Sequence, residues 1–302
     1  MKSPRSARET DMRQITQSLL FIGALSLTGC SKKSSGSYDV PDATTDAAAS
    51  PTGVSADDLW GERQDSNKLQ LALERYEAAY AANPRDRQTV IRLTRGWYFY
   101  GDAYQSTDDE KAAAWDTAIG WGKKCLGLNR EFTALLEKGN ETEATAARVL
   151  TEDDVACAYW TATALGKWAG LQGLSTLLKN KGTVFALITR VTELKPDFFY
   201  SAPDRYWGAY YAALPGFAGQ DLGKSATHFD ASIAGSPAYL GTSVLKAQYW
   251  AVKTQNKDAF ETLLNGVVSA DISGNPKIMP ENMAEQAKAR DLLARKDDLF
   301  AD

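Results

Sequence analysis

The strongest constraint on the fold is a spaced pattern of small residues, an aromatic residue and a proline. In the stretch ALERYEAAYAANP it consists of Ala72, Tyr76, Ala79 and Pro84. In a helix, the small side chains allow a second helix to approach, and the aromatic ring fills the groove between the two. Proline ends the helix because it has no backbone N–H to donate. The pattern therefore predicts one member of a packed helix pair.

The same spacing recurs further along the chain, which indicates a repeat architecture. The copies are Ala118, Gly122, Cys125 and Arg130; Val184, Ile188, Val191 and Pro196; Ser225, Phe229, Ser232 and Pro237; and Ala259, Leu263, Gly266 and Asp271. The last copy follows the one before it by 34 residues, the period of tetratricopeptide (TPR) repeats, and the other intervals are longer. Because apolar spacing indicates helices throughout, we expect an all-α, TPR-like array of degenerate repeats with insertions.

The closing segment PENMAEQAKARDLLARKDDLF is expected to form a capping helix. Pro280 suits the first turn of a helix, where no backbone N–H is needed. Met283, Ala287, Arg290 and Leu293 then lie roughly along one side. A repeat array needs such a cap because its last repeat would otherwise expose an apolar face.

The first 30 residues have the organisation of a bacterial lipoprotein signal peptide. The apolar run Leu19–Leu27 is shorter than the roughly 18–20 residues that span a bilayer. The run ends in Leu-Thr-Gly-Cys, which resembles the lipobox, and Cys30 is then the lipidated first residue of the mature chain. Met12 is an alternative start to Met1, because acidic residues before it do not suit a basic leader.

We expect three parts: a signal peptide at 1–30, a flexible tether at 31–56 and a helical domain at 57–302. The tether is rich in Ser, Ala, Thr, Asp and Pro, a composition that buries too little apolar surface to fold. As a coil it would span roughly 28 Å. Several acyl chains would hold the protein at the membrane. Ser31, rather than Asp, follows the cysteine, which favours the outer membrane by resemblance to the common sorting pattern.

Composition argues against several function classes. The net charge is −4 and no basic stripe is present, so a nucleic-acid partner is not expected. His228 is the one histidine, which leaves no His-metal cluster and no His-based catalytic set. We expect no enzyme, cofactor or metal, although carboxylate chemistry stays open. Cys125 and Cys157 either pair in an oxidising compartment or are two small apolar residues on helix faces.

Aromatic residues are concentrated between positions 200 and 217. The candidate site residues are Tyr200, Arg205, Tyr206, Trp207, Tyr210, Tyr211 and Phe217. Aromatic residues at helical spacing are usually core. These rings cover more of the helix circumference than one seam requires, so we expect part of the set to line a cleft with Phe217 at its lip. Arg205 either meets a carboxylate of a ligand or partner or, slightly favoured, forms a surface ion pair.

Several sequence blocks resemble one family when taken in order. They are CAYWTATALGKWAGL (157–171), APDRYWGAYYAALP (202–215), AGQDLGKSATHFDASI (218–233) and ENMAEQAKARDLLARKDDLF (281–300). They resemble the TatT-type T component of tripartite ATP-independent periplasmic (TRAP) transporters, most strongly from Ala156 onward. Ser201 and Ala202 depart from a Gly-Gly pair that often precedes the family's proline, and Ala218–Gly219–Gln220 splits another pair.

The resemblance implies a periplasmic, TPR-like lipoprotein that assembles as a homotrimer. Each subunit would carry a pore or cleft, bind the transporter's solute-binding P component and hold or pass on its ligand, which is suspected to be apolar. A generic TPR lipoprotein scaffold for envelope protein assembly is the alternative. Genes for a P component beside this one, or an aromatic-lined tunnel, would separate the two.

Overall fold

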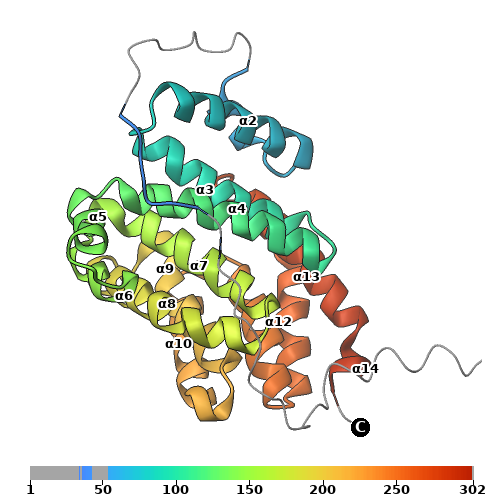
Figure 1. Cartoon of the computed structure of the whole chain (residues 1–302). Coiled ribbons are helices and arrows are strands. Elements are labelled where there is room, and N and C mark those ends of the chain that lie inside the picture. The colour runs from blue at the N-terminus through green and yellow to red at the C-terminus, as the bar shows by residue number, and fades with distance from the viewer. Residues whose placement is uncertain (1–33, 35, 43–53, 301–302) are drawn as a thin grey trace, which may run out of the picture. The chain divides into compact units, whose positions relative to one another are not determined.

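The computed structural model describes residues 34, 36–42 and 54–300. Within these residues the chain is helical and contains no β-strand (Figure 1), so the predicted all-α fold is confirmed. The expected signal peptide and lipidation site, Cys30, lie outside the described residues. Among the described residues, no helix has both the length and the hydrophobicity that crossing a membrane requires.

The described residues form a series of α-helices of different lengths. They are α1 (Ala56–Gly61), α2 (Ser66–Ala82), α3 (Arg87–Ala103), α4 (Asp108–Gly127), α5 (Arg130–Glu137), α6 (Glu143–Ala146), α7 (Val155–Leu171), α8 (Leu174–Leu194), α9 (Phe198–Ala213), α10 (Leu222–Gly235), α11 (Gly241–Leu245), α12 (Lys257–Ser269), α13 (Met279–Ala294) and α14 (Lys296–Leu299). A π-helical segment, η5 (Lys246–Ala251), continues α11. Short 3-10 turns include η4 (Gly216–Ala218).

The five copies of the repeat pattern fall on α2, α4, α8, α10 and α12. Each of these helices packs against the one before it: α2 on α1, α4 on α3, α8 on α7, α10 on α9, and α12 on α11 and η5. Helix starts follow ordinary capping chemistry. For example, the Asp86 side chain accepts a hydrogen bond from the Thr89 N–H at the start of α3. The repeated spacing thus predicted one helix of each pair, and the structure shows that it is the second.

One copy is out of register. The sequence pattern placed Ala259, Leu263 and Gly266 at the helix contact, but the buried residues of α12 are Phe260, Leu264 and Val267. The neighbouring apolar residues at positions 260, 264 and 267 fit the helix period equally well. Packing selected the larger side chains, since burying them removes more apolar surface from water.

Helix α7 lies at the centre of the array and contacts α3, α4, α8 and α9 (Figure 1). It is apolar around its circumference, as a helix with neighbours on every side must be. A disulfide joins Cys157 of α7 to Cys125 of α4, with the two Cα atoms 5.4 Å apart. The alternative left open by the sequence is thereby settled in favour of a pair.

The C-terminal helix α13 does more than cap the array. It packs on α12, as expected, and also contacts α3 near the beginning of the domain. The predicted contact side was wrong, because Met283 and Arg290 are exposed while Glu281, Glu285 and Ala289 are buried. Apolar periodicity did not find this side, since two of its buried residues are carboxylates: Glu281 pairs with the distant Arg63, and Glu285 pairs with Lys288 one turn further along α13.

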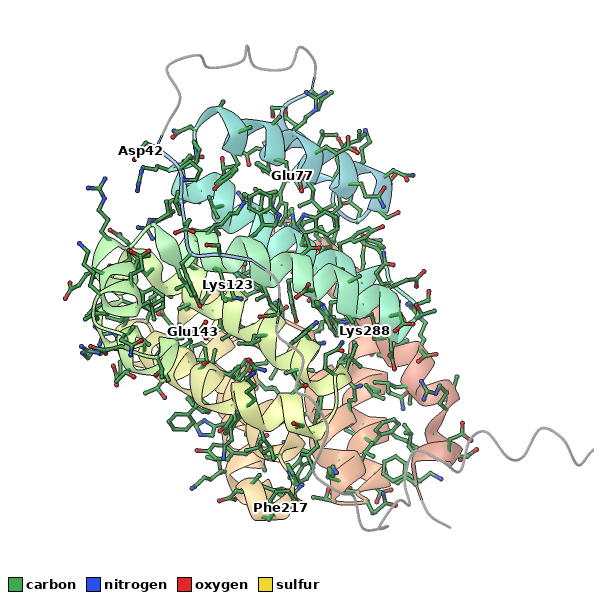
Figure 2. The ribbon with its side chains drawn as sticks, viewed as in Figure 1. Asp42, Glu77, Lys123, Glu143, Phe217 and Lys288 are labelled. Atoms are coloured by element: carbon green, nitrogen blue, oxygen red, sulfur yellow. A yellow bond between two sulfur atoms is a disulfide. The ribbon has the colours of Figure 1, made fainter. Side chains whose placement is uncertain are left out.

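Part of the expected tether contacts the domain. The Tyr38 ring packs edge-on against Phe132 at 5.5 Å, and its hydroxyl donates to Oε1 of Glu143, which is marked in Figure 2, at 2.6 Å. Lys123, also marked in Figure 2, donates to the Ser34 carbonyl at 3.3 Å. Gly127 of α4 lies so close to the Tyr38 carbonyl that a side chain there would collide with it. Residues 36–42, which we call the strap, are therefore not a free coil.

Candidate ligand cavity

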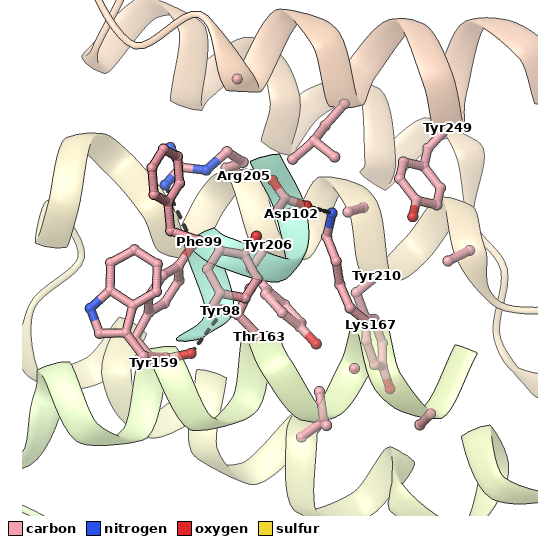
Figure 3. Close-up of a pocket in the computed structure, with 18 of the residues that line it drawn as sticks. Tyr98, Phe99, Asp102, Tyr159, Thr163, Lys167, Arg205, Tyr206, Tyr210 and Tyr249 are labelled. Carbon is pink, nitrogen blue, oxygen red and sulfur yellow. Dashed lines mark hydrogen bonds and ion pairs between the residues drawn. The ribbon is translucent and has the colours of Figure 1, made fainter. Parts of the chain in front are cut away.

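A cavity lies where α3, α7, α8, α9, η5 and α13 meet (Figure 3). It holds about 150 Å³ of space for water-sized molecules and is partly enclosed. Helix α13 contributes Glu281, Glu285 and Lys288 to its wall, so the C-terminal helix closes a space that the first repeats begin. A concave, mostly apolar site with a few polar groups is the usual form of a small-molecule site.

Aromatic rings form most of the cavity's apolar wall. They are Tyr98, Phe99, Tyr159, Trp160, Tyr206, Tyr210, Tyr239 and Tyr249. Burial raises the pKa of Tyr210 to about 12 and raises those of Tyr206 and Tyr239 further. The hydroxyls therefore stay protonated at neutral pH and can donate or accept hydrogen bonds. Rings of this kind suit a flat or aliphatic ligand that also carries polar atoms.

Asp102 is the centre of a charged cluster in the cavity wall. It accepts a hydrogen bond from Lys167 on α7 and another from Lys288 on α13, the latter at 2.5 Å (Figure 3 shows Lys167). Lys288 also donates to Glu285 at 2.7 Å. Burial opposes ionisation of Asp102, but the two lysines outweigh it, and the pKa of Asp102 lies well below its usual range.

A second cluster surrounds Glu281. Its carboxylate accepts hydrogen bonds from the guanidinium groups of Arg63 and Arg95, with the shortest N–O distance 2.7 Å in each pair. Arg95 lies over the Trp160 and Phe199 rings at 5.2 and 4.4 Å from their centroids. Burial raises the pKa of Glu281, but Arg95 and Arg63 reverse this and hold it below its usual value. The cluster joins α13 to the first helices.

Arg205 lies at one end of the cavity and is only 4% exposed. Its guanidinium donates to the carbonyls of Phe199 (3.3 Å) and Tyr200 (3.0 Å) and to the hydroxyl oxygen of Tyr159 (3.4 Å). The Tyr239 ring lies against it, 4.1 Å from the guanidinium carbon to the ring centroid. The expected surface ion pair is wrong, since none of the described carboxylates forms an ion pair with Arg205.

An unusual turn presents those carbonyls. Phe199, Tyr200 and Ser201 have left-handed backbone conformations, with φ of 41°, 58° and 55°. Left-handed conformations cost roughly 1–2 kcal/mol per non-glycine residue. Ser201 stands where the resembled family often has glycine, which adopts this conformation without strain. Such strain persists where the surrounding structure over-determines it, and it is common at binding sites.

Three of the predicted site residues line the cavity: Arg205, Tyr206 and Tyr210 (Figure 3). The Tyr206 hydroxyl donates to the Ala162 carbonyl at 3.4 Å, which fixes the ring against α7. Tyr206 and Tyr210 are four residues apart, so one face of α9 presents both rings to the cavity. Part of the predicted aromatic set thus lies in the cavity wall, and its role in binding a ligand stays a prediction.

The other four predicted residues lie elsewhere. Trp207 is 7% exposed, packs against Phe185 and donates its Nε1–H to Thr192 Oγ1 at 3.0 Å, so it belongs to the contact with α8. The Tyr211 ring stacks on the His228 ring at 5.8 Å, toward α10. The structure therefore places both on the side of α9 that faces α8 and α10.

Tyr200 and Phe217 also lie outside the cavity lining. Tyr200 stacks on Tyr239 at 5.8 Å and accepts a hydrogen bond from Asn275, so it supports the wall from behind. Phe217 is 78% exposed at the outer edge of the molecule (Figure 2), on the turn η4. No lip over the cavity is formed by this ring.

Sequence reasoning missed the charged members of the site. Asp102, Lys167, Glu281, Glu285 and Lys288 were not among the predicted site residues. One signal was available, because Lys167 is the only charged residue within the otherwise apolar stretch VACAYWTATALGKWAGL. A lone cation in a helix that is apolar on all sides must be buried with a counter-charge. Nothing local in the sequence identifies that partner as Asp102.

Comparison with known protein families agrees with this architecture. Residues 66–300 match the family model TAtT, described as TRAP transporter T-component. A comparison with curated proteins gave no match. The matched range spans α2 through α14 and contains every residue of the cavity wall. The chain therefore belongs to the TRAP transporter T-component family, which is a family of transport accessory components rather than of enzymes.

Proposed function

We propose that this protein is a lipid-anchored periplasmic component of a TRAP-type transport system, that it docks the solute-binding P component, and that its cavity holds the solute. The observation that carries the proposal is the coincidence of the family match with a partly enclosed aromatic cavity formed by residues far apart in the chain. A generic scaffold needs only outer surfaces, whereas a cavity of this composition suits a small molecule.

The anchor is proposed to be the lipidated Cys30, with the outer membrane as its location. The strap supports a close attachment, because Tyr38 holds it on α5 and α6 and only a few residues separate it from Cys30. Replacing Cys30→Ala is expected to abolish labelling by radioactive palmitate and release the protein from membranes. Density-gradient separation of inner and outer membranes then locates the wild-type protein.

The homotrimer is proposed from the family resemblance. The folded chain from residue 32 is expected to have three times its monomer mass by light scattering. A monomer at micromolar concentration would contradict this part of the proposal. Docking and ligand holding are independent of that measurement.

The decisive experiment separates docking from ligand holding. Ala209 lines the cavity on α9, and Ala209→Phe would fill the space between Tyr206 and Tyr210. Ala78 is exposed on α2, and Ala78→Phe is the matched control. Affinity capture from periplasmic extract, with mass spectrometry of proteins and small molecules, is the measurement.

We expect wild type, Ala78→Phe and Ala209→Phe to recover the same solute-binding protein. A small molecule is expected with the first two and not with Ala209→Phe. Loss of the small molecule alone supports both docking and the cavity. Recovery of unrelated envelope proteins without a solute-binding protein would overturn docking and favour a scaffold role.

A further inference from the structure

The buried guanidinium of Arg205 lacks a counter-charge within the described part of the chain. All four of its hydrogen-bond partners are neutral oxygens, namely three already described and the Thr242 hydroxyl at 3.5 Å. Arginine stays protonated in proteins, so the charge cannot be removed by losing a proton. A buried charge is normally paired, because desolvation without a partner is costly.

The nearby carboxylates are all engaged with other cations. Asp102 is held by two lysines, Glu285 by one of the same lysines, and Glu281 by two arginines. Five cationic and three anionic side chains line the cavity. One of the cationic residues, Lys181, donates to the Ala218 carbonyl rather than to a carboxylate. The described lining therefore has an excess of positive charge, and Arg205 is its most buried uncompensated member.

The surroundings of Arg205 fix the direction of its guanidinium. The left-handed turn at 199–201 aims two carbonyls at it, and the Tyr239 ring supports one face of its plane. Tyr239 is itself held by stacking on Tyr200. A planar, oriented guanidinium matches the two oxygens of a carboxylate better than a single point charge does. A bound carboxylate would replace the two longest contacts of Arg205, from Nη2 to Tyr159 at 3.4 Å and from Nη1 to Thr242 at 3.5 Å.

We propose that the cavity binds an amphipathic organic acid whose carboxylate pairs with Arg205 and whose apolar body lies against Tyr206 and Tyr210. The inference rests on the proposed ligand-holding function and names its ligand class. The rings continue from Arg205 along α9, so one molecule can contact both features (Figure 3). A neutral apolar ligand would leave the buried cation unpaired, which is why an acid is preferred.

The test compares 3-phenylpropanoate with its neutral amide by titration calorimetry at pH 7, using the folded chain from residue 32. The acid is expected to bind wild type at least tenfold more tightly than the amide. Arg205→Gln is expected to remove this preference, because it should weaken binding of the acid and leave the affinity for the amide unchanged. Arg190→Gln is the matched control, because Arg190 lies on α8 outside the cavity lining and pairs with Glu193.

Arg205→Lys keeps the charge without the planar group and is expected to show an intermediate preference. It also serves if Arg205→Gln does not fold, as judged by circular dichroism. Equal binding of acid and amide to wild type, binding of neither, or an acid preference that survives in both Arg205 variants would overturn the inference. Capture of the solute-binding protein by wild type is scored separately, so failure of the acid preference does not count against docking.

Discussion

Glu281 in the first turn of α13 forms a two-point ion pair with Arg63, a residue 218 positions earlier in the chain. Arg63 Nε lies 3.1 Å from one carboxylate oxygen and Nη2 lies 2.7 Å from the other. Arg95 binds the same carboxylate from α3. This contact joins the end of the array to its beginning and helps to enclose the cavity between them.

Replacing Glu281→Gln should lower the free energy of unfolding by about 3 kcal/mol at pH 7. The change leaves two buried guanidinium groups without their shared counter-charge, which costs more than the net value of the pair. Urea denaturation followed by circular dichroism measures the effect. Glu261→Gln is the control, since the pair of Glu261 with Lys296 is partly exposed, and it should change stability by less than about 1 kcal/mol. Equal effects would contradict the closing role of Glu281.

Stability should fall in acid because of Asp102 and Glu281. Both pKa values are held below their ordinary values of 3.8 and 4.5. A lowered pKa means that the stabilisation is complete above the ordinary value and is lost as the pH falls through the folded-state value. The free energy of unfolding should therefore decline below about pH 4.

The variant Asp102→Asn tests how much of the loss of stability in acid is due to Asp102. At pH 7 it should lower the free energy of unfolding by about 2–4 kcal/mol, because Lys167 and Lys288 lose their common partner. The difference from wild type should shrink as the pH falls below about 4, because the unfolded wild type then binds a proton at Asp102 that the folded protein, with its lowered pKa, still excludes, whereas asparagine binds none. Denaturation at several pH values checks this, with the exposed Asp230→Asn as control. A difference that stays constant with pH would rule out the charge explanation.

Removal of the disulfide should lower stability without changing the fold. The bond joins residues 32 positions apart, and the chain-entropy estimate for such a loop is about 3–4 kcal/mol. The double variant Cys125→Ala/Cys157→Ala is compared with wild type by urea denaturation. Both cysteines are fully buried, so alanine also leaves the space of two sulfur atoms, and this cavity adds to the loss of stability. In wild-type protein from residue 32, a thiol assay should find no free cysteine; two free thiols would contradict the pair.

The strap should come free when Tyr38 is replaced. Tyr38→Ala removes both the ring contact with Phe132 and the hydrogen bond to Glu143. Amide hydrogen exchange in residues 36–42 should then become faster, while α7 keeps its protection. Tyr38→Phe, which keeps the ring, should give an intermediate result. Unchanged exchange in Tyr38→Ala would mean that the strap does not depend on this contact.

The sequence was sufficient to predict the helix pairs and the family. Small, aromatic and proline residues at fixed spacing predict the helix pairs because helix geometry places such residues on one face. The family was predicted from the resemblance of longer sequence blocks. In three of the five copies the first three positions are all buried, as for Ala118, Gly122 and Cys125 of α4, whereas in the copy on α2 Ala79 is exposed although Ala72 and Tyr76 are buried. The copy on α12 shows the limit of this prediction, since two adjacent faces of that helix are both apolar enough to form the helix contact.

The side of α9 that faces the cavity could not be chosen from the sequence. Tyr206 and Tyr210 form one aromatic stripe, and Trp207 and Tyr211 form a second stripe one residue further around the helix. Both are apolar enough to be buried, and the choice depends on what lies on each side. The array places α8 and α10 against one stripe and the cavity against the other.

The sequence by itself determined an all-α array with helix pairs, because helix formation and pairwise packing depend on residues a few positions apart. Only the tertiary structure decided where the buried charges meet. Lys167 on α7 forms an ion pair with Asp102 on α3, and Glu281 near the end of the domain forms one with Arg63 near its beginning. Arg205 donates hydrogen bonds only to neutral oxygens among the described residues. Ion pairing between distant segments leaves no local periodicity, because its energy depends on distance in space rather than on separation along the chain.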